Sequence, residues 1–528
     1  MKLFADLLER LAFTPSRLGK LALLRAYFTR APDPDRGYAL AAIAGTLRLP
    51  AIRPNMVRAL AATRTDPTLF AWSYEFVGDL AETVALLWPG TGSGTLPGLS
   101  KLIETLAGAE KSALPAQLAT WLDAATIPER YALLKLITSG LRVGVSARLA
   151  KTALAELATP KIDPDEIEEI WHALAPPYLS LFAWLEGRAP RPDPGAAPIF
   201  RPPMLAHPLT APDRATLDLA DHQIEWKWDG IRVQLVATPI ERRLYSRGSE
   251  DISTTFPEIL LAMNFHGVLD GELLVIRNGD VAPFGDLQQR LNRRTISARH
   301  MTEFPTGIYL YDILFDGRTD LRALPLATRR QHLEAFLSRH PDPRLHLSPL
   351  IELTDWPALD ALWASSRASN REGLMLKQKS SPYLAGRPKG NWWKWKRDPL
   401  TIDAVLMYAE RGHGKRGGTY SDYTFGVWTE DGRLVPVGKA YSGYTDKELV
   451  ILDRFIRTHT LQTFGPVREV EKTLVLEIAF DAAQSSTRHK SGIALRFPRI
   501  NRLRPDKPAS EADRLTTLQA LITAEEKK

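Results

Sequence analysis

The spacing of hydrophobic residues changes twice along the chain, and each change marks a predicted domain. In the first part, leucines recur at helical spacing, beginning with Leu3, Leu7, Leu8 and Leu11. Strand-like alternation is scarce there, and further helices are predicted at 36–48, 100–107, 127–139, 146–157 and 163–174. Ser146 has the side chain expected of a residue that begins a helix. We therefore expect an all-α domain over residues 1–190.

A proline-rich segment follows the helical part. Six of the sixteen positions from Arg188 to Pro203 are proline, a composition typical of a semi-rigid linker. We place the linker at 191–203, so that the next domain begins at Met204 and ends at Asp398.

Residues 204–398 mix strand and helix patterns. The segment 266–284 predicts a β-hairpin that turns at Asn278-Gly279. Further strands are predicted at 307–315 and 372–379, and helices at 286–300, 326–338 and 356–367. This mixture predicts an α+β domain.

The pattern changes again near Pro399. Short strands joined by glycine-rich turns are predicted at 401–409, 422–429, 433–440 and 473–480, followed by a helix near 509–524. Residues 399–528 are therefore expected to form a small β-barrel with a C-terminal helix. The predicted fold class is a multi-domain protein with an all-α, an α+β and a β-barrel domain.

The composition limits the kind of protein. The chain has 528 residues, of which 44% are hydrophobic and 24% charged, as in ordinary globular proteins. No run of 18 or more apolar residues occurs, so we expect neither a membrane span nor a membrane partner. The first thirteen residues carry acids and no small-residue cleavage site, unlike a signal peptide. Cysteine is absent, which excludes disulfides, thiolate zinc sites and cysteine nucleophiles. We expect a cytoplasmic protein.

The charge favours an anionic partner. The formal net charge is +7, and the segment from Arg488 to Lys507 holds seven lysines and arginines against one acid, Asp506. A second basic cluster comprises Arg290, Arg293, Arg294 and Arg299. Nucleic acid is the leading candidate partner, and a basic protein without such a partner is the alternative.

One lysine in the α+β domain is a candidate nucleophile. The stretch EWKWDGIRVQLVA (225–237) enters a strand through a tight turn. In an extended segment Lys227 shares a face with Glu225 and Asp229, opposite the two tryptophans. A free lysine has a pKa of about 10.4, so it must be desolvated or lie near other positive charge to attack at neutral pH. A salt-bridged lysine on a half-buried strand is the alternative interpretation.

Five later segments carry side chains that could serve the same reaction. In chain order they are Ser246-Arg247, Asp270-Gly271-Glu272, Tyr311-Asp312, Glu372-Gly373, and Lys394 with Lys396 in WWKWK. Each segment alone is weak evidence for a functional site, because Asp-Gly is usually a turn and WWKWK is typical of a half-buried strand. Together, a lysine, carboxylates, an aromatic ring and several cations can bind a nucleoside triphosphate with Mg²⁺.

These segments resemble the motifs of the covalent nucleotidyltransferases and, within them, the ATP-dependent DNA ligases. KWDGIR is similar to the family's K-x-D-G-x-R motif, and SRGSED, DGE, YD, EGLMLK and WKWK are similar to its later motifs in the same order. LRFPR (495–499) resembles the last motif, which lies in the barrel. MLAHP (204–208) and LRVG (141–144) resemble segments of the larger cellular and archaeal ligases. Tyr311 is a mild departure, because phenylalanine is common there.

The resemblance implies a three-step reaction with ATP as the cofactor. Lys227 would attack the α-phosphate of ATP to form lysyl-AMP, and the AMP would pass to the 5′-phosphate of a DNA nick. The 3′-hydroxyl would then seal the strand and release AMP. Glu225 would read adenine, Tyr311 would stack on it, and Glu272 and Glu372 would hold Mg²⁺. The resemblance also implies ribose or phosphate contacts for Arg232, Arg247, Glu272, Arg387, Lys394 and Lys396.

The family implies roles for the other two domains as well. Arg496 and Arg499 would orient pyrophosphate when the C-terminal barrel, an OB-fold, closes over the site. The residues themselves suggest DNA contacts elsewhere. Arg142 and Arg148, around the predicted helix start at Ser146, could hold a phosphate, and an ordinary helix–turn–helix corner is the alternative. Lys415 and Arg416 in the glycine-rich loop 412–418 could follow the DNA phosphates, and a mobile solvent loop is the alternative. We expect a monomer that encircles nicked duplex DNA in repair or replication, with binding that is salt-sensitive and largely indifferent to sequence.

Several alternatives share some of these features. A capping-type guanylyltransferase or an RNA ligase would not need the long helical domain, and an NAD-dependent ligase normally carries a cysteine-ligated zinc module. A bacterial end-joining ligase shows a similar stretch at 311–330 but usually lacks the helical domain. A non-catalytic DNA-binding clamp is the last alternative, and the intact lysine, glutamates and late arginines argue against it.

Overall fold

The computed structural model describes residues 1–49, 53–110, 112–138, 141, 143–291, 293, 296–353, 355–366, 370–412, 420–486 and 489–526. Its backbone divides into two compact units. One comprises residues 1–157, 176–182 and 399–528, and the other comprises 158–175 and 183–398. Within the described residues, no helix has the length and apolar character needed to cross a membrane.

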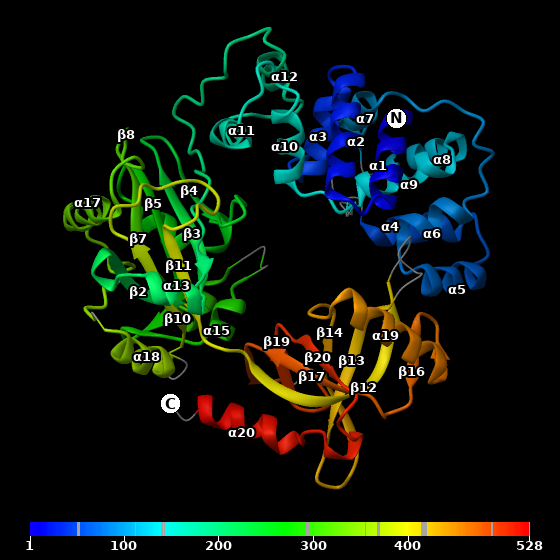
Figure 1. Ribbon diagram of the computed structural model, residues 1–528. Helices are drawn as coiled ribbons and strands as arrows, with labels where there is room; N and C mark the ends of the chain where they lie inside the picture. Colours follow the sequence, from blue (N-terminus) through cyan, green and yellow to red (C-terminus); the bar gives the residue numbers. More distant parts are fainter. Residues whose placement is uncertain are drawn as a thin grey trace. The chain divides into compact units, whose positions relative to one another are not determined.

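The N-terminal part is helical, as predicted (Figure 1). Its helices are α1 (Lys2–Phe13), α2 (Arg17–Arg30), α3 (Asp35–Ala44), α4 (Pro54–Ala62), α5 (Pro67–Val77), α6 (Leu80–Leu87), α7 (Leu99–Gly108), α8 (Leu114–Ala124), α9 (Ile127–Ile137), α10 (Ala147–Ala155), α11 (Pro164–Trp171) and α12 (Leu179–Leu185). The leucines that predicted α1 are buried at Leu7, Leu8 and Leu11. The Ser146 hydroxyl accepts a hydrogen bond from Leu149 N at 3.2 Å, which confirms that it begins α10.

Two sheets form the α+β domain. The smaller contains β1 (His207–Pro208), β2 (His222–Trp228), β10 (Arg371–Gln378) and β11 (Trp392–Lys396), in the order β1-β11-β10-β2. The larger contains β3 (Ile231–Ala237), β4 (Arg242–Ser246), β5 (Gly267–Arg277), β6 (Asp280–Val281), β7 (Thr306–Asp316), β8 (Thr319–Asp320) and β9 (Leu345–Leu347), along the path β4-β3-β5-β7-β8. β2 runs into β3 through Asp229-Gly230 alone, so the candidate nucleophile lies where the chain passes from one sheet to the other.

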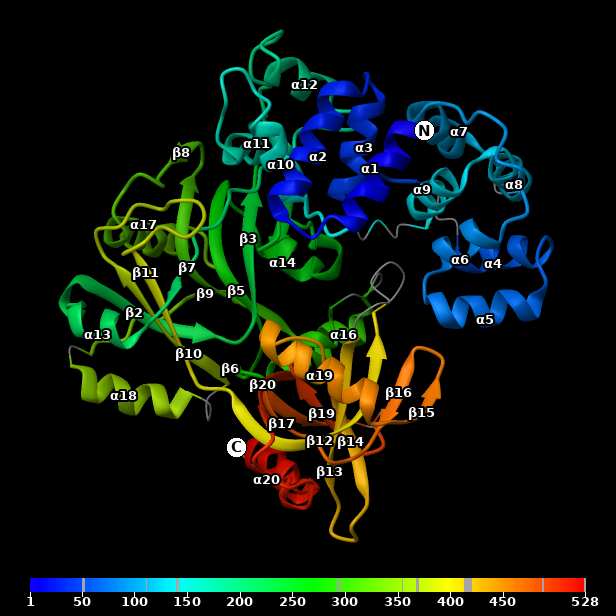
Figure 2. The ribbon, with the colours of Figure 1, turned by 45° about the vertical axis from the view of Figure 1, so that its right-hand side comes forward.

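Helices cover the apolar faces of both sheets (Figure 2). The helices of this domain are α13 (Ala211–Thr216), α14 (Pro257–Ala262), α15 (Phe284–Gln288), α16 (Ala298–Glu303), α17 (Leu326–Arg339) and α18 (Trp356–Ser365). Leu333 and Phe336 of α17 share a buried core with the large sheet, and Leu359 of α18 packs with the tryptophans of the small sheet. The predicted hairpin turn is confirmed, because Asn278 and Gly279 have φ values of 54° and 90° between β5 and β6.

The C-terminal domain is rich in strands. Its elements are β12 (Leu400–Arg411), β13 (Tyr420–Trp428), β14 (Leu434–Ala440), α19 (Asp446–Thr458), β15 (Thr460–Phe464), β16 (Val467–Val470), β17 (Val475–Phe480), β18 (Ala482–Ser485), β19 (Ile493–Arg496), β20 (Arg499–Arg504) and α20 (Leu515–Glu526). β12 pairs with β13, β16 and β17, so this long central strand joins the sheet around one apolar core. Helix α20 begins later than the predicted helix at 509–524, after a short 3-10 turn at Ala509–Glu511.

The predicted helix at 286–300 is wrong. α15 ends at Gln288, and α16 begins after Ser297, whose hydroxyl accepts a hydrogen bond from His300 N. Arg290 does not lie on an exposed helix face, because its guanidinium points into the core and pairs with Glu258 at 2.8 Å. It is fully buried, so Arg290 does not contribute to a basic surface.

A buried ion pair fixes α17 against the large sheet. Arg329 and Asp312 have fully buried side chains, and Arg329 Nε lies 2.8 Å from Asp312 Oδ1. Replacing Arg329 with Met should lower the free energy of unfolding by about 3–5 kcal/mol, because it leaves a buried carboxyl without its partner. Urea denaturation of the full chain, followed by tryptophan fluorescence, measures this loss.

The control for this prediction is the double variant Arg329→Met/Asp312→Leu. It should recover much of the lost stability, because neither charge then remains buried alone. An equal loss in the single and double variants would show that packing, and not the ion pair, holds the helix.

Candidate active site

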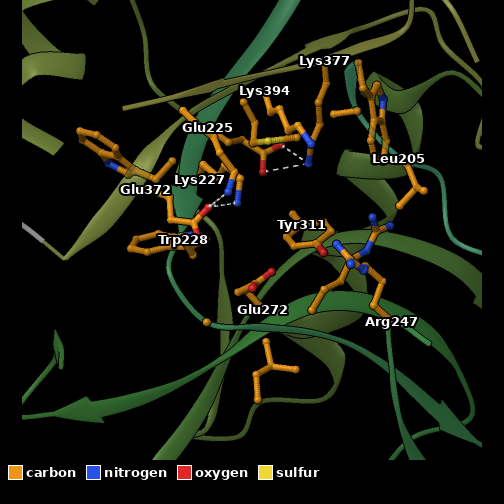
Figure 3. A pocket seen from close by; sticks show the side chains of 18 of the residues that line it. Leu205, Glu225, Lys227, Trp228, Arg247, Glu272, Tyr311, Glu372, Lys377 and Lys394 are labelled. Atoms are coloured by element: carbon orange, nitrogen blue, oxygen red, sulfur yellow. Dashed lines mark hydrogen bonds and ion pairs between the residues drawn. The ribbon is translucent and has the colours of Figure 1, made fainter. Parts of the chain in front are cut away.

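A cavity of about 570 Å³ lies in the α+β domain (Figure 3). It is lined by all the residues of this domain that the sequence predicted as catalytic or nucleotide-binding. These are Glu225, Lys227, Arg232, Arg247, Glu272, Tyr311, Glu372, Arg387, Lys394 and Lys396. The fold therefore gathers residues that lie as far apart in the sequence as Glu225 and Lys396.

The register of the small sheet directs Lys227 into the cavity. Lys227 pairs with Gly373 of β10, and Gly373 pairs with Lys396 of β11. Directly paired residues point to the same face of a sheet, so Lys227 and Lys396 share the cavity side. Trp226 and Trp228 of β2 and Trp393 and Trp395 of β11 occupy the opposite face and pack together with Leu374 and Leu376. The predicted alternation of lysine and tryptophan is confirmed.

A β-bulge aims Glu372 at Lys227. Arg371 pairs with Trp228 and Gly373 pairs with Lys227, so Glu372 is an extra residue in β10. Gly373 has a φ of 137°, and a Cβ there would lie 2.1 Å from the carbonyl oxygen of Trp395. Only glycine fits this position without shifting the backbone, which explains the Glu-Gly pair in physical terms.

Glu372 forms ion pairs with two lysines on neighbouring strands. Its Oε2 contacts Lys227 Nζ and lies 3.1 Å from Lys396 Nζ. Burial alone would raise the pKa of Glu372, but the charges of Lys227 and Lys396 lower it to about 2. Glu372 is therefore ionised at neutral pH and holds the Lys227 side chain in place.

Glu272 differs from Glu372, because its pKa is raised and not lowered. It lies on β5, where it pairs with Arg232 of β3. Burial raises its pKa to about 8; Lys227 opposes this shift and the negative charge of Glu372 adds to it. Two carboxyl groups of one cavity thus have pKa values on either side of neutrality.

Arg232 is held by a buried network. Its Nε donates to Asp270 Oδ1 at 3.1 Å, its Nη1 donates to the Met204 carbonyl at 2.6 Å, and its Nη2 donates to Tyr383 Oη at 3.1 Å. Tyr383 in turn donates to Asp270 Oδ2 at 2.7 Å. Most of the donors of Arg232 are therefore engaged by the protein, which fixes the guanidinium at the cavity wall.

Lys377 was not predicted as a site residue, yet it completes the floor of the cavity. Its Nζ lies 3.0 and 3.1 Å from the two carboxylate oxygens of Glu225, and both side chains are almost fully buried. It also lies 4.3 Å from the centre of the Tyr311 ring. The alternation of side chains along β10 could have predicted this position, because Gly373, Met375 and Lys377 share the face of Lys227.

Three further cations reach the cavity from its rim. Arg247 follows β4 and Arg387 precedes β11, and both are exposed. Burial lowers the pKa of Lys394, and the neighbouring charges of Arg387, Lys396, Lys227 and Arg247 lower it further. This repulsion shows that the cations lie close enough to act together on one anion.

Three further predicted residues, Arg148, Arg496 and Arg499, belong to the other compact unit. Arg496 and Arg499 lie in the C-terminal domain, at the end of β19 and the start of β20, and Arg499 Nη1 donates to Asp481 Oδ1 at 3.1 Å. Arg148 is exposed on α10. Arg142, Lys415 and Arg416 lie outside the described residues.

Comparisons with known proteins identify the family. A family described as "ATP dependent DNA ligase domain" matches residues 203–396, and one described as "ATP dependent DNA ligase C terminal region" matches residues 416–507. A probable DNA ligase of Koribacter versatilis is 32% identical over 99% of this chain and 97% of its own length. The chain belongs to the ATP-dependent DNA ligases.

Two further similarities extend over the whole ligase. DNA ligase 1 of Korarchaeum cryptofilum is 29% identical over 100% of this chain and 99% of its own length. A solved structure named Pmar-Lig_PreS3 shares the fold with a TM-score of 0.59 at 18% identity, over 95% of this chain and 99% of that one. The predicted fold class, with its helical region, adenylation domain and OB-like domain, is confirmed. So is the predicted activity, the sealing of DNA nicks by an ATP-dependent ligase.

The donor set of the ligase cavity fits Mg²⁺ bound together with a nucleotide. Glu272 and Glu372 both line it, and Mg²⁺ usually takes one or two protein carboxylates and completes its shell with water and substrate phosphates. Among the residues that the structure describes, no group of three or more His, Cys, Asp or Glu side chains could hold a metal. The carboxylates would thus share the ion with the phosphates of ATP.

The raised pKa of Glu272 predicts a pH-dependent stability. A carboxyl whose pKa rises from 4.5 in the unfolded chain to about 8 in the folded one binds its proton more tightly when folded. The ligase should therefore lose stability as pH rises from about 4.5 to about 8, by at most about 1.4 kcal/mol per pH unit from this group. Denaturant titrations at several pH values measure the slope.

Glu272→Gln should remove this part of the slope and be more stable than the wild type above about pH 8. Glu303→Gln, at an exposed carboxylate of the same domain, is the matched control and should keep the slope. If the slope stays the same in Glu272→Gln, Glu272 is not the titrating group.

Proposed function

We propose that Lys227 is the nucleophile of this ligase. Its placement in the cavity, held by Glu372 beside Lys396, is the observation that carries the proposal. The Lys227 amine, once it has lost a proton to solvent, attacks the α-phosphorus of ATP; a P–N bond forms, the P–O bond to pyrophosphate breaks, and the nitrogen releases a second proton to solvent. The lysyl-AMP then transfers its AMP to the 5′-phosphate at a nick. The 3′-hydroxyl displaces AMP from that activated phosphate and seals the strand.

The cavity residues divide into a base-binding and a phosphate-binding group. Glu225 and Tyr311 take the adenine, with Lys377 fixing the Glu225 carboxylate beneath it; the buried ion pair supports this role. Arg247, Arg387, Lys394 and Lys396 take the ribose and phosphates, where fixed cations stabilise charge that develops in the transition state. Arg232 contacts ribose or phosphate from its network with Asp270.

Glu272 and Glu372 would hold Mg²⁺, which supplies charge neutralisation at the phosphate oxygens. Because Glu272 has a pKa of about 8, it would give up a proton on binding that cation at neutral pH.

The other parts of the ligase are assigned to DNA binding and to the arrangement of the domains. We propose that residues 1–190 form the DNA-binding domain, 191–203 the linker, 204–398 the adenylation domain and 399–528 the OB domain. Arg142, Arg148, Lys415 and Arg416 contact DNA phosphates, and the net charge of +7 supports electrostatic binding. We also propose a monomer that encircles nicked DNA in the cytoplasm, acting in repair or replication.

Loss of the Lys227 amine should abolish lysyl-AMP formation. Wild type and Lys227→Ala are incubated with α-labelled ATP and Mg²⁺ and separated by denaturing electrophoresis. Label should stay on the wild type, be acid-labile as expected of a phosphoramidate, and leave when nicked DNA is added. It should be absent from the variant.

Lys379→Ala is the matched control for Lys227→Ala. Lys379 is exposed at the end of the same small sheet, where its Nζ donates to the Ala220 carbonyl at 2.7 Å, so this variant should label like the wild type. Label on Lys227→Ala would disprove the assignment.

The arginines of LRFPR should matter for the first step alone. Arg499→Ala and Arg496→Ala should slow lysyl-AMP formation by about a hundredfold, because each removes a cation assigned to pyrophosphate. Sealing of a nick that already carries 5′-AMP should be nearly unchanged. Quenched-flow measurements of each step separate the two effects.

Arg502→Ala provides the comparison on the same strand. Arg502 is exposed and pairs with Glu477 at 2.8 Å, so its loss should leave both steps intact. An equal loss in both steps for Arg499→Ala would instead assign Arg499 to DNA binding or folding.

A further inference from the structure

The turn that carries Arg247 is a tight loop at the end of β4. Ser246 N donates to the Glu250 carbonyl at 2.9 Å, and Ser249 N donates to the Ser246 carbonyl at 3.0 Å. Ser249 has a φ of 66°, a left-handed conformation that non-glycine residues adopt only when their surroundings enforce it. Arg247 and Glu250 of this turn line the cavity, and Figure 3 shows Arg247 at its edge.

A histidine from another part of the chain contacts this turn. His172 directly follows α11, and its Nε2 lies 3.1 Å from the Ser249 carbonyl oxygen. A carbonyl oxygen can only accept, so Nε2 carries the hydrogen and donates. The hydrogen bond from His172 is therefore made to Ser249, the residue with the disfavoured backbone conformation. Ser249 lies two positions after Arg247 in the same turn.

Packing fixes the orientation of the His172 ring. The ring centre lies 4.6 Å from that of Tyr245 and 6.0 Å from that of Phe200. Tyr245 belongs to β4 and donates its hydroxyl to the Pro198 carbonyl at 2.7 Å. The aromatic cluster of His172, Phe200 and Tyr245 thus joins the helix end to the strand that leads into the turn.

Ion pairs fix α11 itself to the same domain. Glu169 of α11 contacts Arg322 at 2.6 Å and Arg191 at 3.5 Å. Burial would raise the pKa of Glu169, but its hydrogen bond with Arg322 and the charges of Arg322, Arg201 and Arg191 lower it. Residues 158–175 belong to the same compact unit as the adenylation strands, so His172 has a fixed base from which to hold the turn.

We propose that His172 is a positioning residue, which holds the turn 246–250 so that Arg247 points at the phosphates or ribose of the bound nucleotide. This inference rests on the role proposed above for Arg247. His172 does not touch the nucleotide; it acts through the Ser249 carbonyl. The end of the helical segment therefore takes part in forming the nucleotide site.

The test uses His172→Phe, which keeps an aromatic ring but removes the donor. In single-turnover labelling with ATP, the KM for ATP should rise about fivefold, the size expected for one hydrogen bond, with little change in the maximal rate. His172→Gln keeps an N–H donor and should recover part of the loss. Thermal unfolding of each variant checks that the full chain remains folded.

A double-mutant cycle separates positioning from general packing. Arg247→Ala should raise the KM for ATP, and adding His172→Phe should raise it no further, because the turn then has no guanidinium to present. His340→Phe is the matched control. His340 lies 4.8 Å from the Phe336 ring in another aromatic cluster of the domain and does not line the cavity, so the KM should stay unchanged.

The outcomes are distinct. If Arg247→Ala raises the KM and His172→Phe does not, the positioning role is overturned and that of Arg247 stands. If the two effects add, His172 acts by a route other than Arg247, and the inference is also overturned. If Arg247→Ala leaves the KM unchanged, the proposed role of Arg247 fails, and the inference falls with it.

Discussion

The active site depends on one carboxylate placed between two ammonium groups. Lys227 and Lys396 lie on strands that flank β10, and both contact Glu372. Without that carboxylate, two cations would face each other across a half-buried strand. The bulge that inserts Glu372 and the glycine that follows it are therefore constraints on the whole small sheet. A side chain at position 373 would collide with the Trp395 backbone, and the register that brings the lysines together would be lost.

Two other buried networks near the cavity also match each charge with an opposite charge. Asp270 binds Arg232 and Tyr383, and Glu225 binds Lys377. In both networks a buried charge is matched by an opposite charge and hydrogen bonds, which is the condition under which burial of ions is tolerated. The cavity walls are thus polar yet rigid, so that the functional groups are positioned before the nucleotide arrives.

The sequence predicted most of this because the site lies on strands. A period of two assigns faces without knowledge of the partners, and it placed Lys227, Glu272, Lys394 and Lys396 correctly at the cavity. It failed where tertiary contacts override local pattern. Arg290 was predicted to lie in a helix and in a basic cluster, but its side chain is buried against Glu258, and α15 ends before it, at Gln288. Lys377 gave no sign of burial, because only the fold brings Glu225 beneath it. Helix α19 was missed, although its capping box of Thr445 and Glu448 is a signal that sequence can show.

The balance of charge in the cavity explains why it suits a triphosphate. Seven cationic side chains and four carboxyl groups line it, and the contacts pair Lys377 with Glu225, Lys227 with Glu372, and Arg232 with the adjacent Asp270. The cations outside these three pairs are Arg247, Arg387, Lys394 and Lys396, the last of which shares Glu372 with Lys227. Their mutual repulsion contributes to the lowered pKa of Lys394. An anion bound among these side chains would relieve that repulsion and favour the charged lysine. Part of the affinity for phosphate is thus set by the fold before the ligand binds, because the strands hold like charges together that would otherwise separate.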